Sequence, residues 1–209
     1  MALSKIDVAN MLTGTAPVAN GGTGVTTSAN IGNLVLLQDK VSASSVANVE
    51  MDLSSDYNYF KLVIHSAEAA TDGTQLTAVL SINGGTSFES GASDYTRINQ
   101  IYTAQNTSTQ NYSNKGSSNI PLSGGFGNQS DENGCGEMFI YPKRDTGSDH
   151  FGNFVTANFM GQNSSDQVRW YNTMAQLVSS QTTAVDAIRL NFTSGNIAKI
   201  TYSLYGFKS

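Results

Sequence analysis

The chain has 209 residues, which is long enough for one all-β domain plus an extension. Charged residues make up 13% of it, about half of the ~25% that is usual in soluble domains. Its 11 Lys and Arg stand against 16 Asp and Glu, so it has no basic surface to collect the phosphates of a nucleic acid or an anionic bilayer, and its single cysteine excludes an intramolecular disulfide.

The first 33 residues differ from the rest of the chain. Charges interrupt the apolar residues of Met1–Val8, so this segment lacks the continuous apolar stretch of a signal peptide, and no run approaches the ~20 residues of a membrane-spanning helix. We therefore expect synthesis in a cytosol and no membrane insertion. A proline and three glycines in residues 17–24 disfavour both helix and regular strand. Residues 1–33 are interpreted as an extended arm or hinge.

From Leu34 onward, apolar and polar side chains alternate repeatedly between turn-forming residues. This pattern predicts a body of residues 34–209 built of strands that each bury one face. The expected inward side chains are Val49, Met51 and Leu53; Phe60, Leu62 and Ile64; Leu76, Ala78, Leu80 and Ile82; Phe151, Val155, Ala157 and Phe159; Ile188, Leu190 and Phe192; and Ile200, Tyr202 and Leu204.

Turn residues separate these strands. A turn at Asp72-Gly73 joins the second and third of them, and residues 83–85 and 194–196 tolerate the positive φ angles of tight turns. The last turn predicts a hairpin over residues 186–206. Helical periodicity is weak throughout, with residues 172–180 as its one candidate. The expected fold is all-β, an antiparallel β-sandwich of jelly-roll-like type with an extended N-terminal arm.

Residues 103–132 are rich in Gln, Asn, Ser, Thr and Gly and contain few apolar anchors, so we expect a long surface excursion. Long loops on a rigid β scaffold often carry binding sites, although an insertion that is poorly ordered or packed by a partner would have the same composition. Aromatic rings with a polar group suit carbohydrate recognition. Tyr95, Tyr102 and Tyr112, near this excursion, are the candidate receptor-contacting residues, whereas Trp170 is assigned to the core or a subunit interface.

Few residues suggest catalysis or metal binding. His65 is expected to be an ordinary exposed imidazole, and Cys135 a buried structural thiol. The acids and imidazole of Asp145, Asp149 and His150 could gather around a cation, but their spacing matches no known metal loop, and a solvated turn is favoured. Residues 131–134 are likewise read as a turn. We expect no catalytic site, no metal and no cofactor, and hence no enzyme.

Eight residues of the arm resemble a known motif. The sequence Pro17-Val18-Ala19-Asn20-Gly21-Gly22-Thr23-Gly24 resembles one that is common in tail fibres and related virion appendages of bacteriophages. The resemblance implies that the arm docks on other virion proteins, with Pro17, Asn20, Gly21, Gly22 and Gly24 as attachment residues.

The body also looks like the C-terminal β-sandwich domains of phage fibre and decoration proteins, through residues 59–62, 70–73, 81–88 and 204–207. Together with the arm motif, this resemblance implies a homotrimeric appendage on the tail or capsid surface. It would be made in the host cytoplasm, and its distal domain would face the host.

Three functions follow as hypotheses. The leading one is a short tail fibre or fibre-like appendage that recognises a glycan or protein on the host surface. The second is a head decoration, cement or head-fibre protein that grips the capsid lattice. The third, from another class, is a carbohydrate-binding or glycan-degrading module in which loop carboxylates such as Asp131, Glu132, Asp145 and Asp149 would act on a surface glycan. Glycosidases need two carboxyls at a defined separation, which a sequence does not display.

Overall fold

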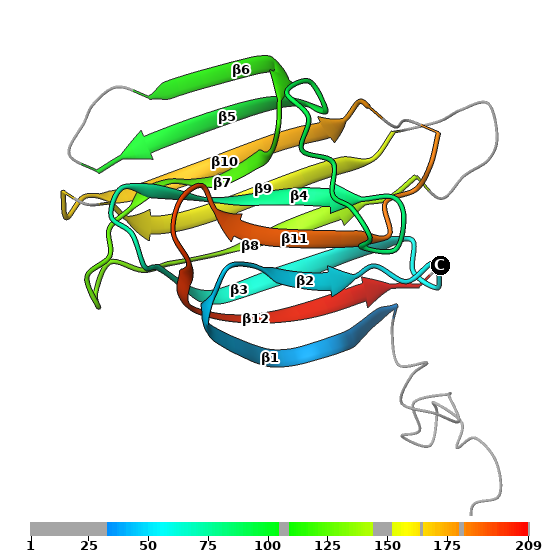
Figure 1. Ribbon diagram of the computed structural model, residues 1–209, viewed down its shortest axis with the longest axis horizontal. Coiled ribbons are helices and arrows are strands. Elements are labelled where there is room, and N and C mark those ends of the chain that lie inside the picture. Colours follow the sequence, from blue (N-terminus) through cyan, green and yellow to red (C-terminus); the bar gives the residue numbers. More distant parts are fainter. Residues whose placement is uncertain (1–32, 105–108, 144–151, 164, 180–181, 209) are drawn as a thin grey trace, which may run out of the picture.

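The computed structural model describes residues 33–104, 109–143, 152–163, 165–179 and 182–208. Within these ranges the chain forms twelve strands and no helix, and the strands make two antiparallel sheets (Figure 1). The predicted antiparallel β-sandwich is therefore confirmed. No helix in the described ranges is long and apolar enough to span a membrane. The predicted arm lies outside them up to residue 32.

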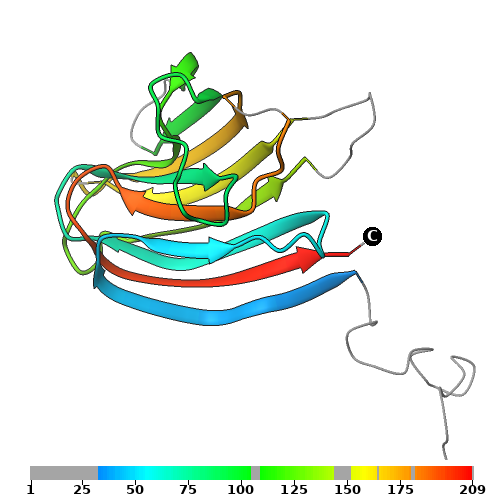
Figure 2. The ribbon, with the colours of Figure 1, turned by 45° about the vertical axis from the view of Figure 1, so that its right-hand side comes forward.

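The two sheets differ in size and form the two layers of the sandwich (Figure 2). The strands are β1 (Leu34–Val46), β2 (Val49–Asp52), β3 (Tyr59–Ala69), β4 (Thr74–Ser81), β5 (Tyr95–Thr103), β6 (Gln110–Ser117), β7 (Ile120–Phe126), β8 (Gly134–Tyr141), β9 (Phe154–Gln162), β10 (Val168–Leu177), β11 (Ala187–Phe192) and β12 (Ile197–Phe207). The larger sheet has the order β1-β12-β3-β8-β9-β10-β5-β6, and the smaller has the order β2-β11-β4-β7. Edge strand β7 packs against β10 and β9, so β6 extends past the edge of the smaller sheet (Figure 1).

The chain crosses repeatedly between the two layers, which corrects the predicted hairpin over residues 186–206. The turn itself is present, since Gly195 has a φ of 71°. However, β11 pairs with β2 and β4, whereas β12 pairs with β1 and β3. Two alternating strands bury their apolar faces equally well side by side or across a sandwich, and turn residues alone do not distinguish these arrangements. Residues 72–73 and 83–85 also lead from one sheet to the other.

The core lies between the sheets and contains the predicted inward side chains. Each of those that the structure describes is buried, apart from Ile82, which is half-buried and packs against the core. Phe151 lies outside the described residues. The agreement follows from the strict two-residue period of a strand, which places alternate side chains on the same face.

Strand β4 is buried on both faces, contrary to the prediction of one polar face. Thr77 and Ser81 are 1% and 0% exposed. The segment after β4 folds back over the smaller sheet, where the amide of Glu89 donates to the carbonyl of Leu80 at 2.8 Å. The Ser81 hydroxyl accepts a hydrogen bond from the Gly85 amide at 3.0 Å. These local polar contacts allow small hydroxyl residues to be buried without an unpaired group.

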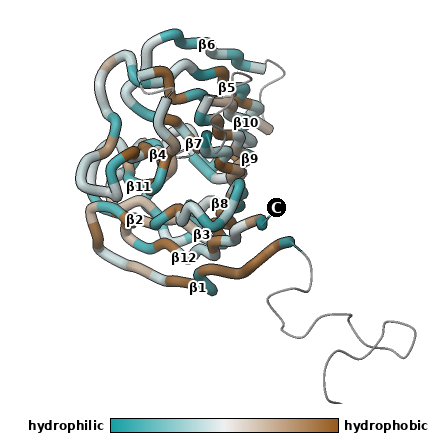
Figure 3. Tube along the Cα trace, turned by 90° about the vertical axis from the view of Figure 1, so that its right-hand side faces the viewer, coloured by the Kyte–Doolittle hydropathy of each residue, from teal (hydrophilic) through white to brown (hydrophobic). Residues whose placement is uncertain are grey.

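The candidate helix at residues 172–180 is wrong, and the predicted surface excursion at residues 103–132 is only partly right, because β6 is exposed whereas β7 is buried. The excursion contains β6 and β7, and residues 172–177 belong to β10. β6 is the outermost strand of the larger sheet and exposes most of its side chains. With neither face in the core, its sequence shows no apolar alternation. Figure 3 shows the contrast with β1 at the opposite edge, where hydrophobic residues are prominent.

A close contact between the layers depends on two glycines. Gly134 in β8 and Gly161 in β9 lie opposite each other, and the ring of Phe126 from β7 rests on both. A Cβ atom at Gly134 would lie 2.2 Å from this ring, and one at Gly161 would lie 2.1 Å from it. The absence of side chains at these positions therefore lets β7 approach the larger sheet.

Candidate functional site

The three candidate receptor tyrosines lie in three different environments. Tyr95 is fully buried. Its hydroxyl accepts a hydrogen bond from the Leu80 amide at 2.8 Å and donates one to the Glu89 carbonyl at 2.9 Å. Burial raises its pKa. Because the side chain is enclosed between the sheets, its assignment as a receptor contact is wrong.

Tyr102 and Tyr112 are 38% and 49% exposed but lie on opposite faces of the larger sheet. Tyr102 faces outward with Trp170, its partner on the neighbouring strand, and their ring centroids are 4.9 Å apart. Tyr112 pairs in register with Asn99, whose side chain is buried between the layers. The predicted residues therefore belong to two separate surfaces.

The first surface is the outward face of the larger sheet. Of the ten large apolar side chains that are exposed among the described residues, nine lie here, and Tyr112 is the exception. They are Leu34, Leu36, Ile98, Tyr102, Tyr141, Met160, Val168, Trp170 and Met174. The stacked rings of Tyr141, Tyr59 and Phe207 continue the face toward β1. We call this the outward apolar face.

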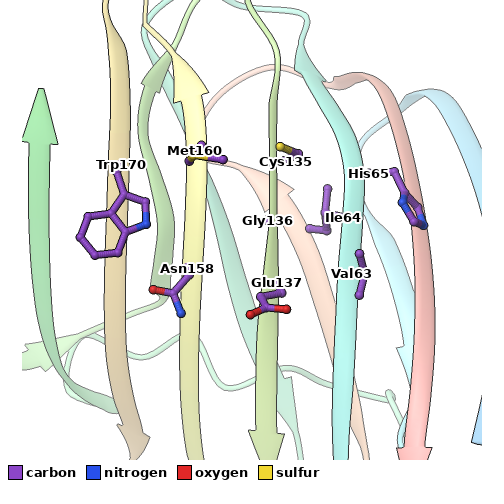
Figure 4. Close-up of a pocket in the computed structure, with 9 residues that line it drawn as sticks. All are labelled: Val63, Ile64, His65, Cys135, Gly136, Glu137, Asn158, Met160 and Trp170. Atoms are coloured by element: carbon purple, nitrogen blue, oxygen red, sulfur yellow. The ribbon is translucent and has the colours of Figure 1, made fainter. Parts of the chain in front are cut away.

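A shallow hollow of about 440 Å³ lies near its centre. Figure 4 shows Trp170, Met160, Cys135 and His65 on the four adjacent strands β10, β9, β8 and β3. Cys135 is exposed, so the prediction of a buried thiol is wrong: the inward positions of this strand are taken by the glycines on either side. His65 is exposed as predicted, and its Nε2 is 2.9 Å from the Ser203 hydroxyl.

The second surface is a groove of about 320 Å³ between the layers, beside the free edge of β7. Its lining comes from β4, β5, β6, β7 and β10, and it exists because β5 and β6 extend past the smaller sheet (Figure 1). The residues that line it include no Asp or Glu. We call this the inter-sheet groove.

A buried polar network holds Arg97 at one part of the groove. Its Nε donates to the Ser117 hydroxyl at 3.0 Å, and its Nη1 donates to Asn99 Oδ1 at 2.6 Å. Asn99 in turn donates to the Thr173 hydroxyl, which donates to the carbonyl of Pro121 at 2.7 Å. This chain joins β5 and β10 to β7 across the two layers. Burial lowers the pKa of Arg97, because the charged form loses hydration.

Arg169 lies farther along the same groove. Its Nε is buried and has no hydrogen-bond partner within the described ranges. Burial raises the pKa of the neighbouring Tyr171, and the Arg169 guanidinium and the Gly124 backbone partly oppose this effect. A Cβ atom at Gly124 would lie 2.2 Å from the Tyr171 hydroxyl, so glycine is required where the phenol meets β7.

Sequence reasoning did not single out either arginine. The available signal was their register: Arg97 and Asn99 share the parity of buried Tyr95, and Arg169 shares that of Tyr171. An arginine on the core-facing side of a strand needs either a counter-charge or an opening to solvent. In the described part of the chain the ion pairs are Lys61–Glu137 and Arg189–Glu50, so neither groove arginine has a carboxylate partner.

The other candidate residues do not form a site. The attachment residues Pro17, Asn20, Gly21, Gly22 and Gly24 lie outside the described residues, as do Asp145, Asp149 and His150. The predicted turn lies slightly earlier, at residues 129–132, where the Glu132 amide donates to the Gln129 carbonyl at 3.0 Å and the Glu132 carboxylate accepts a hydrogen bond from the Gln129 amide at 2.8 Å; Gly134 already belongs to β8. Among the residues that the structure describes, no three His, Cys, Asp or Glu side chains are grouped to hold a metal ion.

Comparisons with known proteins give little. No family model matches the chain, and no curated protein matches it. Among solved structures, a chain in the structure of infectious bursal disease virus, Gt strain, is similar at 10% identity with a TM-score of 0.12. The match covers 84% of this chain and 39% of the viral chain. At that TM-score the similarity carries no argument about fold or function.

Proposed function

We propose that this chain is a non-enzymatic structural protein of a bacteriophage particle, a short tail fibre or fibre-like appendage that assembles through its outward apolar face and displays its sandwich for host recognition. The observation that carries the proposal is the concentration of nine large exposed apolar side chains on one face of one sheet. The arm motif of residues 17–24 supports the assignment to phage virions.

The size of the face favours a permanent partner. Its nine apolar side chains are between 38% and 55% exposed, which together leaves several hundred Å² of mainly apolar surface open to water. A patch of that size is rare on a monomeric protein, and one partner in a stable interface contributes about 800 Å². The face therefore has the extent and character of a protein interface.

The charge distribution favours further copies of the same chain as that partner. Along β8, β9, β10 and β5 the outward side chains include one charged group, Glu137, and its carboxylate is 2.6 Å from the ammonium of Lys61. Copies that meet through these strands would bring no unpaired like charges together. The homotrimer implied by the arm resemblance is consistent with this self-compatible face.

A head decoration or cement protein is the second candidate, because the same apolar face would also pack on a capsid lattice. The two candidates differ in where the face is covered. In an appendage, copies of the chain cover one another's faces before they reach the particle. In a cement protein the isolated chain stays monomeric, and the face is covered by the lattice.

The test is the native molar mass of the full chain by light scattering, compared with a Met160→Glu variant. Met160 is 54% exposed at the centre of the face, so a charge there should leave the fold intact and prevent association. We expect three chains per particle for the natural protein and one for the variant. Thr86→Glu adds the same charge at an exposed turn beyond the smaller sheet and should remain trimeric.

A monomeric natural protein would overturn the fibre assignment. The cement candidate would then gain support if particles without the protein adsorbed normally to hosts but broke more readily on heating or osmotic shock. If both Met160→Glu and the natural chain were trimeric, association would have to run through another surface. Competition of the purified protein with phage adsorption tests the recognition role separately.

A further inference from the structure

Two cationic side chains, Arg97 and Arg169, line the inter-sheet groove, and neither pairs with a carboxylate of the described residues. In the register of β5 and β10, Arg97 lies opposite Ala175 and Arg169 lies opposite Thr103. Their backbones are thus six strand positions apart, or about 20 Å. The groove is therefore elongated, with a guanidinium toward each end, and its shape suits an extended ligand rather than a single small ion.

Each guanidinium retains donors for a ligand. Arg97 donates Nε to Ser117 and one Nη1 hydrogen to Asn99, which fixes its plane, and its Nη2 group has no acceptor among the described residues. The Arg169 guanidinium hydrogen-bonds Tyr171, while its buried Nε pairs with no acceptor in the described part of the chain. Partly buried cations with unused donors are costly to a folded protein, and an entering carboxylate would offset that cost with charge-assisted hydrogen bonds.

Neutral polar groups fill the space between the cations. Gln75, Gln110 and the half-exposed ring of Tyr112 line the groove. The outer edge of β7 pairs with no strand there in the described part of the chain, although its Pro121 carbonyl accepts a hydrogen bond from Thr173 and Phe126 forms a bridge to Asn163. Side-chain amides pair with hydroxyls, and an exposed tyrosine ring can stack on the apolar face of a sugar. This combination of neutral polar contacts and spaced cations fits a chain of sugars better than a densely charged polymer.

We propose that the inter-sheet groove binds an acidic oligosaccharide, a run of sugars whose carboxylates meet Arg97 and Arg169 while a sugar ring stacks on Tyr112. The inference rests on the proposed recognition role and names the class of ligand that the protein would recognise. The binding reaction itself involves no covalent step. It depends on the groove and not on the outward apolar face.

The experiment is calorimetric titration of the full-length protein with four probes of equal length. Two are acidic saccharides, hexagalacturonate and hexasialate, which distinguish uronic from sialic acids. Maltohexaose is the neutral saccharide, and hexaglutamate is the acidic peptide. We expect at least one acidic saccharide to bind, with affinity that falls as salt rises, and we expect maltohexaose and hexaglutamate to bind at least tenfold more weakly.

Single charge removals locate the site. Arg97→Gln and Arg169→Gln should each weaken binding about tenfold or more, since each removes a charge-assisted contact. Arg189→Gln is the matched control: it removes the same charge from the smaller sheet, where Arg189 pairs with Glu50 at 2.8 Å, and should bind like the natural protein. Thermal unfolding checks each variant. If Arg97→Gln is unfolded, Arg169→Gln, which leaves the hydrogen bonds of Arg97, Asn99 and Thr173 intact and removes only the contact with Tyr171, decides the question.

Three results would overturn the inference: no heat from either acidic saccharide at millimolar concentration, equal affinity in Arg169→Gln and Arg189→Gln, or tighter binding of hexaglutamate than of either saccharide. Light scattering on the same samples separates this inference from the proposed function. A monomer that binds an acidic saccharide would refute the fibre assignment and keep the groove. A trimer that binds no acidic saccharide would keep the fibre assignment and refute the groove inference.

Discussion

The outward apolar face and the inter-sheet groove are built from the same strands yet differ in chemistry. On β10, Trp170 and Met174 point outward while Arg169 and Tyr171 point toward the smaller sheet. On β5, Ile98 and Tyr102 alternate in the same way with Arg97 and Asn99. The comparison teaches that one pair of strands can carry an assembly surface and a binding surface at once, because adjacent side chains face opposite sides.

The difference also reverses the usual arrangement of a sandwich. The inward side of β6 and the middle of the inward side of β5 are polar because the smaller sheet ends at β7 and leaves a groove beside them. The outward side is apolar although no part of the described chain covers it. Each departure from the simple pattern of apolar inside and polar outside marks a candidate interaction surface.

The largest expected effect removes the scaffold that both surfaces share. Phe126 is 1% exposed and rests on Gly134 and Gly161 across the layers. Phe126→Ala should reduce the free energy of unfolding by about 3–5 kcal/mol, through lost burial and the cavity left behind. Chemical denaturation measures this loss. Both trimer formation and saccharide binding should fail together at temperatures where the variant unfolds, and a loss below 1 kcal/mol would contradict the role of this contact.

The next effect separates the two surfaces. Trp170→Ala should weaken association by about 2 kcal/mol, or roughly thirtyfold, because exposed tryptophans are frequent anchors of interfaces. Stability of the single chain should change little, since the residue is 38% exposed and its ring packs against the equally exposed Tyr102. Sedimentation over a concentration series measures the association constant. Saccharide affinity should be unchanged, and a parallel loss of both activities would show that the surfaces are coupled.

Much of the fold could be predicted from the sequence, but little of its pairing could. Alternation identified the inward faces of Phe60, Leu62 and Ile64 because burial depends on local period. It missed β6, whose two faces are both open, and it wrongly joined β11 to β12 because a turn at Gly195 serves a hairpin and a crossover alike. Which strands pair with each other is decided by packing between residues far apart in the sequence. The local alternation of apolar and polar residues carries no information about that packing.

The candidate site was less predictable. Tyr102 and Tyr112 were identified as exposed aromatics, but Tyr95 is part of the core, and nothing local distinguishes it from them. The groove depends on where the smaller sheet ends, which is a property of the assembled sandwich. Arg97 and Arg169 carried a usable signal in their inward register, and a search for arginines in phase with core residues would have found both.

A smaller effect tests the burial of Tyr95 through pH. Its pKa is raised in the folded chain by burial, so the neutral phenol is favoured there, whereas the unfolded chain ionises near pH 10. The stabilisation is therefore complete below pH 10 and is lost as the pH rises through the folded pKa. Tyr95→Phe should lower the free energy of unfolding by about 1 kcal/mol at pH 7, because two hydrogen bonds of the hydroxyl are lost. The free energy of unfolding, measured from pH 9 to 11, should fall less steeply with pH in the variant than in the natural protein. Identical slopes for the two proteins would contradict an enclosed phenol.

The smallest effect lies on the outward apolar face, in its paired charges. The ion pair of Lys61 and Glu137 is partly exposed, at 28% and 41% for the two side chains, and exposed pairs contribute only about 0–1 kcal/mol to folding. Glu137→Gln should thus leave the midpoint temperature of thermal unfolding within about a degree or two of that of the natural chain. Yet in each trimer it would leave the Lys61 ammonium unpaired on every copy, and covering that charge in an interface has a cost. Association of the variant should be weaker than that of the natural chain, and added salt should narrow the gap because it screens repulsion between the copies. If association is unchanged at every salt concentration, the strands around Lys61 lie outside the interface, and assembly is confined to the half of the face near Trp170.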